Sequence, residues 1–200
     1  MLFKCGWVGV GLVWLCAAQV MFGAPDYVII DPGHGGIDRG GMPGQVIPEK
    51  GLTLDTAKRL RQVLARTGRV RPIMTRASDV FVPLGARTAI ANRYGGKNAV
   101  FVSIHYNAGA RVGAYGIETY YYNPRALRLA QAVQRRVIKA MDSIDRGVWQ
   151  RGFFVLRKNR LPAILVECGF LTNPEEAQRA LNPLYRQRIA EAVAQAILDY

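Results

Sequence analysis

The chain has 200 residues, which is the length of one domain with room for a short appendage. Half of the residues are hydrophobic and 20% are charged, a composition that supports a buried core and excludes an intrinsically disordered chain. The formal net charge of +13 at pH 7 concerns partners and solubility, because net charge does not specify a fold.

The N-terminal segment is typical of an export signal. Lys4 provides a positive start, and residues 5–22 contain no charge. Small residues favour cleavage after Ala18, while the 18-residue apolar stretch leaves an uncleaved membrane anchor as the alternative. Residues 1–24 are therefore predicted to be a secretory signal peptide or an anchor. Residues 25–200 form the predicted functional domain of an exported protein, located in the periplasm, the cell wall or outside the cell.

Cysteine usage indicates a domain without disulfide bonds. Of the three cysteines, Cys5 and Cys16 lie in the predicted export segment. Cys168 is then alone, so we expect no internal disulfide after cleavage. Stability must come from the core or from a bound metal.

Beyond the export segment, short apolar runs alternate with longer helical patterns. Strand-like runs occupy residues 27–31, 70–75, 99–104, 116–122 and 163–166. Helical periodicity occupies residues 52–66, 84–93, 125–141 and 184–199. This alternation predicts a single α/β domain with a twisted, mostly parallel sheet and helices on both faces.

The two histidines of the chain both follow predicted strands. His34 lies just after the run at 27–31, and His105 lies just after the run at 99–104. In open α/β sheets, ligands bind beyond the carboxyl ends of the strands. A single histidine is more often structural, but two at strand ends favour a metal site. Catalytic zinc usually takes three protein ligands and leaves a fourth position for water, so a third ligand is required.

The third ligand is expected to be a carboxylate, because Cys168 is alone. Glu49 is preferred over Asp38, since it lies in the glycine-rich loop that begins at His34. Its alternative role is that of a first-turn acid that complements the dipole of the next helix. Asp31 is expected to brace the loop through backbone hydrogen bonds. Other acids fall on predicted helices or loops and are expected to be solvated: Asp55, Asp79, Asp142, Asp145, Glu175, Glu176, Glu191 and Asp199.

Glu167 has a different context, at the mouth of a buried strand. It follows the apolar residues 164–166, where a carboxylate is costly to bury without a partner. A water on a metal would be such a partner, and burial would raise the pKa of Glu167 toward the range useful for accepting a proton. The alternative is a structural carboxylate paired with an arginine. Glu118, in an aromatic-rich strand, is a candidate rim or substrate residue.

Four motifs, in order, resemble those of the zinc-dependent N-acetylmuramoyl-L-alanine amidases and cover the chain from about Tyr27 to Tyr200. The first is VIIDPGHGG at residues 28–36, followed by Asp38, two glycines and Glu49. The others lie at residues 75–92 (TR, Asp79, Leu84, Arg87 and AN), 101–108 (FVSIHYNA) and 166–173 (VECGFLTN).

The resemblance implies a fold and a reaction. It implies a twisted, mostly parallel sheet of six strands flanked by helices. It implies one Zn²⁺ held by His34, Glu49 and His105, with Glu167 as the catalytic base. The implied reaction on peptidoglycan is hydrolysis of the amide bond between the lactyl group of N-acetylmuramic acid and the L-alanine of the stem peptide.

Further positions concern the substrate and control. Asn107, Arg76 and Arg87 are the candidate substrate-binding residues, and the arginines would hold stem carboxylates through bidentate contacts, with packing as the alternative role. Tyr106 replaces the small residue usual in the family and is expected to narrow one wall of the cleft. The short connection from Asn107 to Glu118 indicates no inserted blocking helix of the kind that activator-controlled members carry. The existence of a protein activator is left open.

One rival enzymatic function remains. A zinc peptidase that cuts within stem peptides or cross-links would use the same chemistry, and only the motif match favours the amidase. No nucleic acid is expected as a partner, since no nucleic-acid-binding motif accompanies the positive charge. That charge is expected to favour association with the anionic cell envelope.

Overall fold

The computed structural model describes residues 23–42, 45–109 and 113–200. Residues 1–22 of the predicted signal peptide or anchor lie outside the described residues. Within the described part, no helix is both long enough and apolar enough to cross a membrane.

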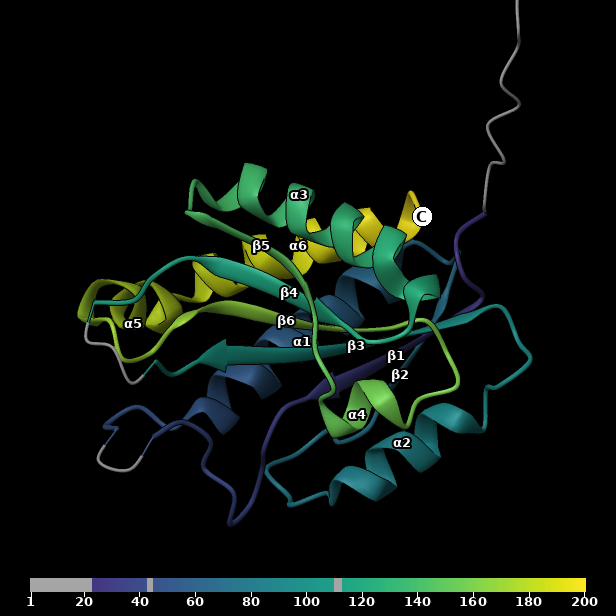
Figure 1. Ribbon diagram of the computed structural model, residues 1–200, viewed down its shortest axis with the longest axis horizontal. Helices are drawn as coiled ribbons and strands as arrows, with labels where there is room; N and C mark the ends of the chain where they lie inside the picture. Colours follow the sequence, from purple (N-terminus) through teal and green to yellow (C-terminus); the bar gives the residue numbers. More distant parts are fainter. Residues whose placement is uncertain (1–22, 43–44, 110–112) are drawn as a thin grey trace, which may run out of the picture.

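A six-stranded sheet forms the centre of the described domain (Figure 1). Its strands, in the order β2-β1-β3-β6-β4-β5, are β2 (Arg71–Met74), β1 (Tyr27–Pro32), β3 (Ala99–Asn107), β6 (Ala163–Phe170), β4 (Ile117–Tyr121) and β5 (Asp145–Gln150). The first four run parallel, β4 runs antiparallel to β6, and β5 runs parallel to β4. The predicted fold class, a mostly parallel α/β sheet in one domain, is confirmed.

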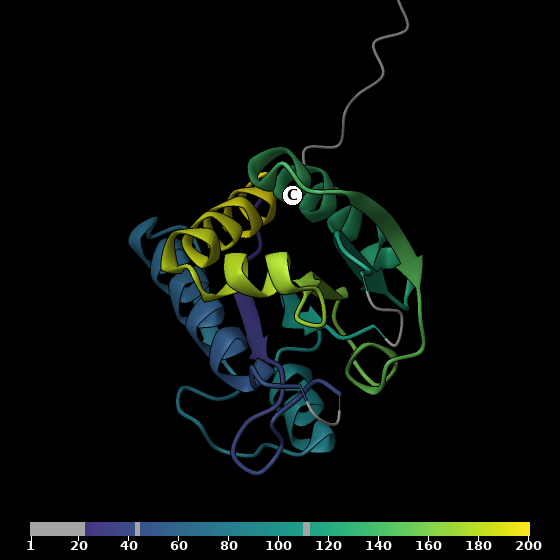
Figure 2. The same cartoon turned by 90° about the vertical axis from the view of Figure 1, so that its left-hand side faces the viewer.

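Helices cover the two faces of the sheet unequally (Figures 1 and 2). The larger layer contains α1 (Glu49–Arg66), α3 (Leu127–Met141), which follows the short 3-10 turn η1 (Pro124–Ala126), and α6 (Pro183–Leu198). The opposite face carries the shorter α2 (Leu84–Asn92) and α4 (Phe154–Arg157), while α5 (Pro174–Leu181) follows the carboxyl end of β6. Helices on both faces agree with the prediction.

The two hydrophobic clusters follow from alternation along the strands, because successive side chains in a strand point to opposite faces. In β3, Val100, Val102 and Ile104 belong to the large cluster beneath α1, α3 and α6. Phe101 packs with the smaller cluster beneath α2 and α4. By the same alternation, His105 belongs to the α2–α4 side, which is the more thinly covered face.

Tyr106 points to the other side of the sheet from His105. It is 1% exposed, and its hydroxyl forms a 2.9 Å hydrogen bond with the Thr56 hydroxyl of α1. Tyr106 is therefore part of the core between β3 and α1. The expectation that it narrows a wall of the cleft is wrong, because a one-residue step along a strand reverses the direction of the side chain.

Several elements differ from the sequence-based expectation. The strand β5 was not predicted, because its sequence DRGVWQ is polar and it lies at the exposed edge of the sheet. The helix α1 begins at Glu49, three residues before the predicted start at Leu52. Consequently Glu49 occupies the first turn of the helix and lies at a fixed position next to the sheet.

Glu176 is buried, although we expected a solvated position. Its side chain accepts hydrogen bonds from the backbone N–H groups of Phe170, at 2.7 Å, and Gly116, at 3.0 Å. These bonds connect α5 to the segments at the ends of β6 and β4. Helical periodicity did not reveal this role, because the partners are backbone groups distant in sequence.

Candidate active site

The candidate site lies at the carboxyl ends of the parallel strands β1, β3 and β6. His34 occupies the loop that follows β1, and His105 lies near the end of β3. Glu49 belongs to the first turn of α1, and Glu167 lies in β6. This position agrees with the general rule for ligand sites in open α/β sheets.

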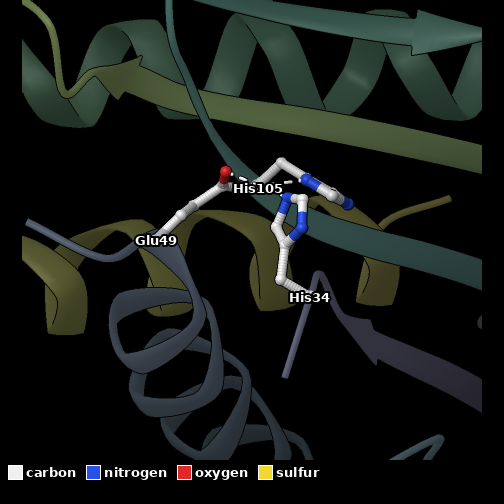
Figure 3. Close-up of side chains that lie close together, drawn as sticks. All are labelled: His34, Glu49 and His105. Atoms are coloured by element: carbon white, nitrogen blue, oxygen red, sulfur yellow. Dashed lines mark hydrogen bonds and ion pairs between the residues drawn. The ribbon is translucent and has the colours of Figure 1, made fainter. Parts of the chain in front are cut away.

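His34, Glu49 and His105 form a compact group of possible metal ligands (Figure 3). One ligand atom from each side chain can be chosen so that all three lie within 4.8 Å of one another. Glu49 Oε2 is 3.0 Å from His34 Nε2, and Glu49 Oε1 is 2.9 Å from His105 Nδ1. Two imidazole nitrogens and one carboxylate are a ligand set that catalytic zinc uses, so the residues fit the metal.

The loop after β1 brings His34 to this position through a strained backbone. His34 has φ of 60°, in the left-handed region that few non-glycine residues adopt, and such strain is common at functional sites. Gly33 passes so close to His105 that a Cβ would lie 2.3 Å from its ring. At Gly40, where φ is 69°, a Cβ would lie 2.6 Å from His34 Cδ2 and 2.7 Å from Glu49 Cβ.

Electrostatics hold Glu49 ionised and orient His34. Burial alone would raise the pKa of Glu49, but hydrogen bonds with His105 and His34 outweigh it and lower the pKa to about 2. Burial lowers the pKa of His34, yet Glu49 and Asp38 together raise it above its ordinary value. Asp38 Oδ2 lies 2.9 Å from His34 Nδ1, which leaves Nε2 directed at Glu49. A carboxylate behind a ligating histidine is a frequent orienting contact in metal sites.

Glu167 lies directly beside His105 and Glu118 in the sheet. The register pairs Glu167 with His105 on β3 and with Glu118 on β4. Among the buried side-chain polar atoms that the structure describes, Glu167 Oε2 is the one without a hydrogen-bond partner. Burial, followed by the negative charges of Glu49 and Glu118, raises the pKa of Glu167 well above its ordinary value. An unpartnered carboxylate oxygen next to a group of possible metal ligands is suited to bind and accept a proton from a water.

Glu118, which neighbours Glu167 on strand β4, accepts hydrogen bonds from three donors. It accepts hydrogen bonds from Asn107 Nδ2 at 2.6 Å, from the Tyr120 hydroxyl at 2.7 Å and from Arg146 Nε at 3.2 Å. Its side chain is 7% exposed. The predicted rim position of Glu118 therefore becomes a buried, fully bonded one, and Asn107 is turned toward it.

Arg76 and Arg87 brace the loop that carries His34. Arg76 is 3% exposed, and its Nη2 donates to the carbonyl oxygens of Gly33, at 2.7 Å, and Lys50, at 2.9 Å. Arg87 is 2% exposed and donates to the carbonyl oxygens of Pro32, at 2.5 Å, and His34, at 2.7 Å. Because these donors are directed at the backbone, the prediction that the arginines hold substrate carboxylates is replaced by the packing alternative.

Asp31 supports the same loop from the end of β1. It pairs with Arg87 Nη1 at 2.9 Å and accepts hydrogen bonds from the hydroxyls of Thr75, at 2.6 Å, and Ser103, at 2.8 Å. Asp31 braces the loop as expected, but its carboxylate does so through side-chain donors and not through backbone N–H groups.

An apolar cleft of about 410 Å³ opens beside the ligand set. His34, Asp38 and His105 line one part of it. The rest is mainly hydrophobic and comes from the segment that leads into α2, from α4 and the residue before it, and from β6, with the side chains Phe81, Val82, Leu84, Phe153, Phe154, Val155 and Leu165. This wall is not predictable from the sequence, because aromatic residues in two distant segments give no common pattern.

Comparison with known proteins connects this geometry to one family. Residues 28–199 match the family described as N-acetylmuramoyl-L-alanine amidase. The solved amidase from Clostridium difficile 630 has a TM-score of 0.83 and 38% identity, over 88% of this chain and 97% of that one. The amidase AmiC2 of Nostoc punctiforme has a TM-score of 0.79 and 40% identity, over 87% of this chain and 96% of that one.

Curated relatives agree with the solved structures. An uncharacterised cell wall amidase of Bacillus anthracis is 37% identical over 189 residues, and the amidase LytC of Bacillus subtilis is 33% identical over 178 residues. Each match covers 86% of this chain but 35% of the relative, so the chain spans about a third of the length of these two proteins.

Proposed function

The chain belongs to the N-acetylmuramoyl-L-alanine amidase family, and from this premise we propose that it is a zinc-dependent peptidoglycan hydrolase. The bond cleaved joins the lactyl group of N-acetylmuramic acid to the L-alanine of the stem peptide. The observation that carries the proposal is the unpartnered, buried Oε2 of Glu167 beside the ligand set His34, Glu49 and His105.

The chain's residues divide the work at the site. His34, Glu49 and His105 would hold one Zn²⁺, which supplies acidification of a water and polarisation of the amide carbonyl when bound. Glu167 accepts the proton of the attacking water and delivers it to the departing amine nitrogen of L-alanine. Burial raises the pKa of Glu167, which makes its carboxylate a stronger base toward the proton of the attacking water.

The cleft walls suggest how the substrate is held. We assign the apolar wall of Phe81, Leu84, Phe153 and Phe154 to the non-reacting part of the substrate, since apolar walls with few polar groups are typical of ligand sites. Asn107, whose amide reaches Glu118, is the remaining candidate for a polar substrate contact. This site excludes much of the solvent around Glu167, which is 9% exposed.

Export is part of the proposal. The predicted signal or anchor at residues 1–24 and the similarity to a cell wall amidase of Bacillus anthracis both favour a location in the periplasm or cell wall. Fractionation of cells that produce the full chain tests it, because the proposal requires the protein outside the cytoplasmic fraction.

Product analysis tests the reaction. Purified peptidoglycan digested with the protein should release intact stem peptides that begin with L-alanine, detected by mass spectrometry. Peptides cleaved internally while the sugar retains its L-alanine would assign the chain to zinc peptidases and overturn the amidase proposal.

The role of Glu167 is tested with a matched pair of variants. Glu167→Gln should lower turnover by about 10²–10⁴-fold, the usual contribution of a general base, and keep one zinc per chain. Glu175→Gln removes an exposed carboxylate outside the site and should leave turnover unchanged. Turnover is measured as peptide release and zinc by elemental mass spectrometry. Full activity of Glu167→Gln would show that another group takes the proton.

A further inference from the structure

The end of the domain opposite the candidate active site has a high density of positive charge. We call this end the amino pole, since it contains the segments that precede β1, β2, β3 and β6 and the helix ends beside them. Its exposed basic residues are Arg66, Arg69, Arg71, Arg93, Lys97, Arg125, Lys158 and Arg160. The acids described in the same segments are Asp26 and Asp199, and Asp199 is paired with Arg136.

Basic residues from separate segments meet on this surface. Lys97 Nζ lies 5.1 Å from the centroid of the Tyr27 ring, and Arg71 Cζ lies 6.0 Å from the same centroid. On the other side of the pole, the Arg125 guanidinium donates to the carbonyl oxygen of Arg160 at 3.3 Å. These contacts show that the fold brings basic residues from distant parts of the sequence to the same end of the domain.

Acidic residues gather at the other end of the molecule. Ten of the fourteen acids lie at or near the carboxyl ends of β1, β3 and β6: Asp31, Asp38, Glu49, Asp79, Glu118, Asp142, Asp145, Glu167, Glu175 and Glu176. Basic side chains such as Lys50, Arg87 and Arg146 are paired with acids at that end, so the excess of bases over acids lies at the amino pole. Near a negatively charged surface, such a distribution turns the amino pole toward the surface and the cleft away from it.

The chain enters the described domain at this same pole. Asn98 Nδ2 donates to the Ala24 carbonyl oxygen at 3.2 Å, and Asp26 N–H donates to the Asn98 carbonyl oxygen at 2.8 Å. The first described residues and the C-terminus lie together on one side of the molecule (Figure 1). Residues 5–22, the uncharged stretch that we predict to be a signal peptide or an anchor, immediately precede Gly23. A bilayer that holds this stretch would face the amino pole.

We propose that the amino pole docks onto a bilayer surface rich in anionic phospholipids, and that this orients the cleft away from the membrane. Lys and Arg side chains recognise the headgroup phosphates, and the attraction weakens within a Debye length of the surface. The proposal narrows a general affinity for the anionic cell envelope to one surface and one partner. It does not depend on the identity of the bond cleaved in the opposite cleft.

Two triple variants of the full chain separate the position of charge from its amount. The pole variant replaces Arg66, Arg93 and Lys158 with glutamine; each is exposed on the amino pole. The control variant replaces Lys139, Arg179 and Arg188 with glutamine; Lys139 and Arg188 are exposed on the halves of α3 and α6 nearer the catalytic end, and Arg179 is exposed on α5, which follows the carboxyl end of β6. Each variant loses three positive charges. Binding is measured by flotation with neutral phosphatidylcholine vesicles and with vesicles that contain 30 mol% phosphatidylglycerol, where about a third of the lipid is anionic.

The wild-type chain should prefer the anionic vesicles, and the preference should fall when salt is added. At about 1 kcal/mol per basic residue, the pole variant should lose about 100-fold of the anionic-over-neutral partition ratio, while the control variant retains it. Equal losses in both variants would show that only net charge matters, and no loss in either would show that the pole is not the contact; each result overturns the proposal. The proposal is also overturned if the pole variant loses its binding to a soluble cell-wall polyanion but keeps its binding to the vesicles.

Discussion

Replacement of Arg87 by alanine distinguishes a bracing arginine from a substrate-binding one. The side chain is 2% exposed and is paired with Asp31, which is 1% exposed. Removing one member of a buried ion pair leaves the other charge uncompensated and typically costs about 3–5 kcal/mol. For a domain of this size about 2–4 °C of melting temperature is lost per kcal/mol, so we expect Arg87→Ala to melt about 6–20 °C below the wild type.

The metal site should weaken in the same variant. Arg87 donates to the carbonyl oxygens of Pro32 and His34, and losing these donors frees the loop that positions a ligand. Mutating an outer contact of a metal site typically lowers metal affinity by about 10–100-fold. Thermal unfolding by circular dichroism and zinc competition with a chromophoric chelator measure the two effects. Arg93→Ala, at an exposed arginine at the C-terminal end of α2, should change the stability by less than about 0.5 kcal/mol.

A double-mutant cycle sharpens the test. Combining Arg87→Ala with Asp31→Asn removes both charges, so the double variant should be more stable than the sum of the two single losses predicts. The bracing interpretation is refuted if Arg87→Ala melts within about 2 °C of the wild type and binds zinc normally while its KM rises, with 2 °C corresponding to roughly 1 kcal/mol or less. That pattern would restore a direct contact with the substrate.

Three further results are expected. Gly40→Ala places a Cβ 2.6 Å from the His34 ring at a φ of 69°, so its zinc affinity should fall while its far-UV circular dichroism stays native; unchanged affinity would mean that the loop yields freely. Burial raises the pKa of Asp55, but Arg59 and Arg186 outweigh it and hold the pKa below its ordinary value of 3.8. The stabilisation that follows from this lowered pKa is complete above about pH 4 and is lost as the pH falls through the pKa of the folded state. Asp55→Asn should therefore destabilise the protein by roughly 0.5–1 kcal/mol at pH 7, and this difference should disappear in acid. Urea unfolding of both proteins at pH 7 and in acid measures it. Chelation of zinc should lower the melting temperature of the wild type and restoration of zinc should recover it, because a ligand that binds only the folded state stabilises that state; equal melting temperatures with and without zinc would contradict a structural coupling.

The ligand set was accessible from the sequence because its members are rare or constrained. The chain has two histidines, and both follow short apolar runs typical of buried strands. Glu49 was chosen for its place in the loop after His34, and the structure brings the three side chains together. Glu167 was found through the cost of burying a carboxylate at a strand end, and the structure leaves its Oε2 without a partner.

The sequence did not predict in which direction several side chains of the site region point. Whether Arg87 reaches the substrate or the backbone of its own loop depends on the position of the loop, which sequence spacing does not define. Tyr106 was placed in the cleft, although one step from His105 along β3 directs it to the opposite face. The buried Glu176 has backbone partners from two other segments, and no periodicity in its own helix reveals them.

The two histidines of the proposed metal site lie on supports of different rigidity. His105 belongs to a central strand that is hydrogen-bonded on both sides, whereas His34 lies in a loop held in a left-handed conformation by side-chain donors. A metal bound to both would fix the strained loop after β1 against the rigid strand β3. Metal binding should therefore slow amide hydrogen exchange in the loop after β1 while exchange in β3 and β6 hardly changes. Loss of the metal would then leave the sheet intact and disorder only the loop after β1.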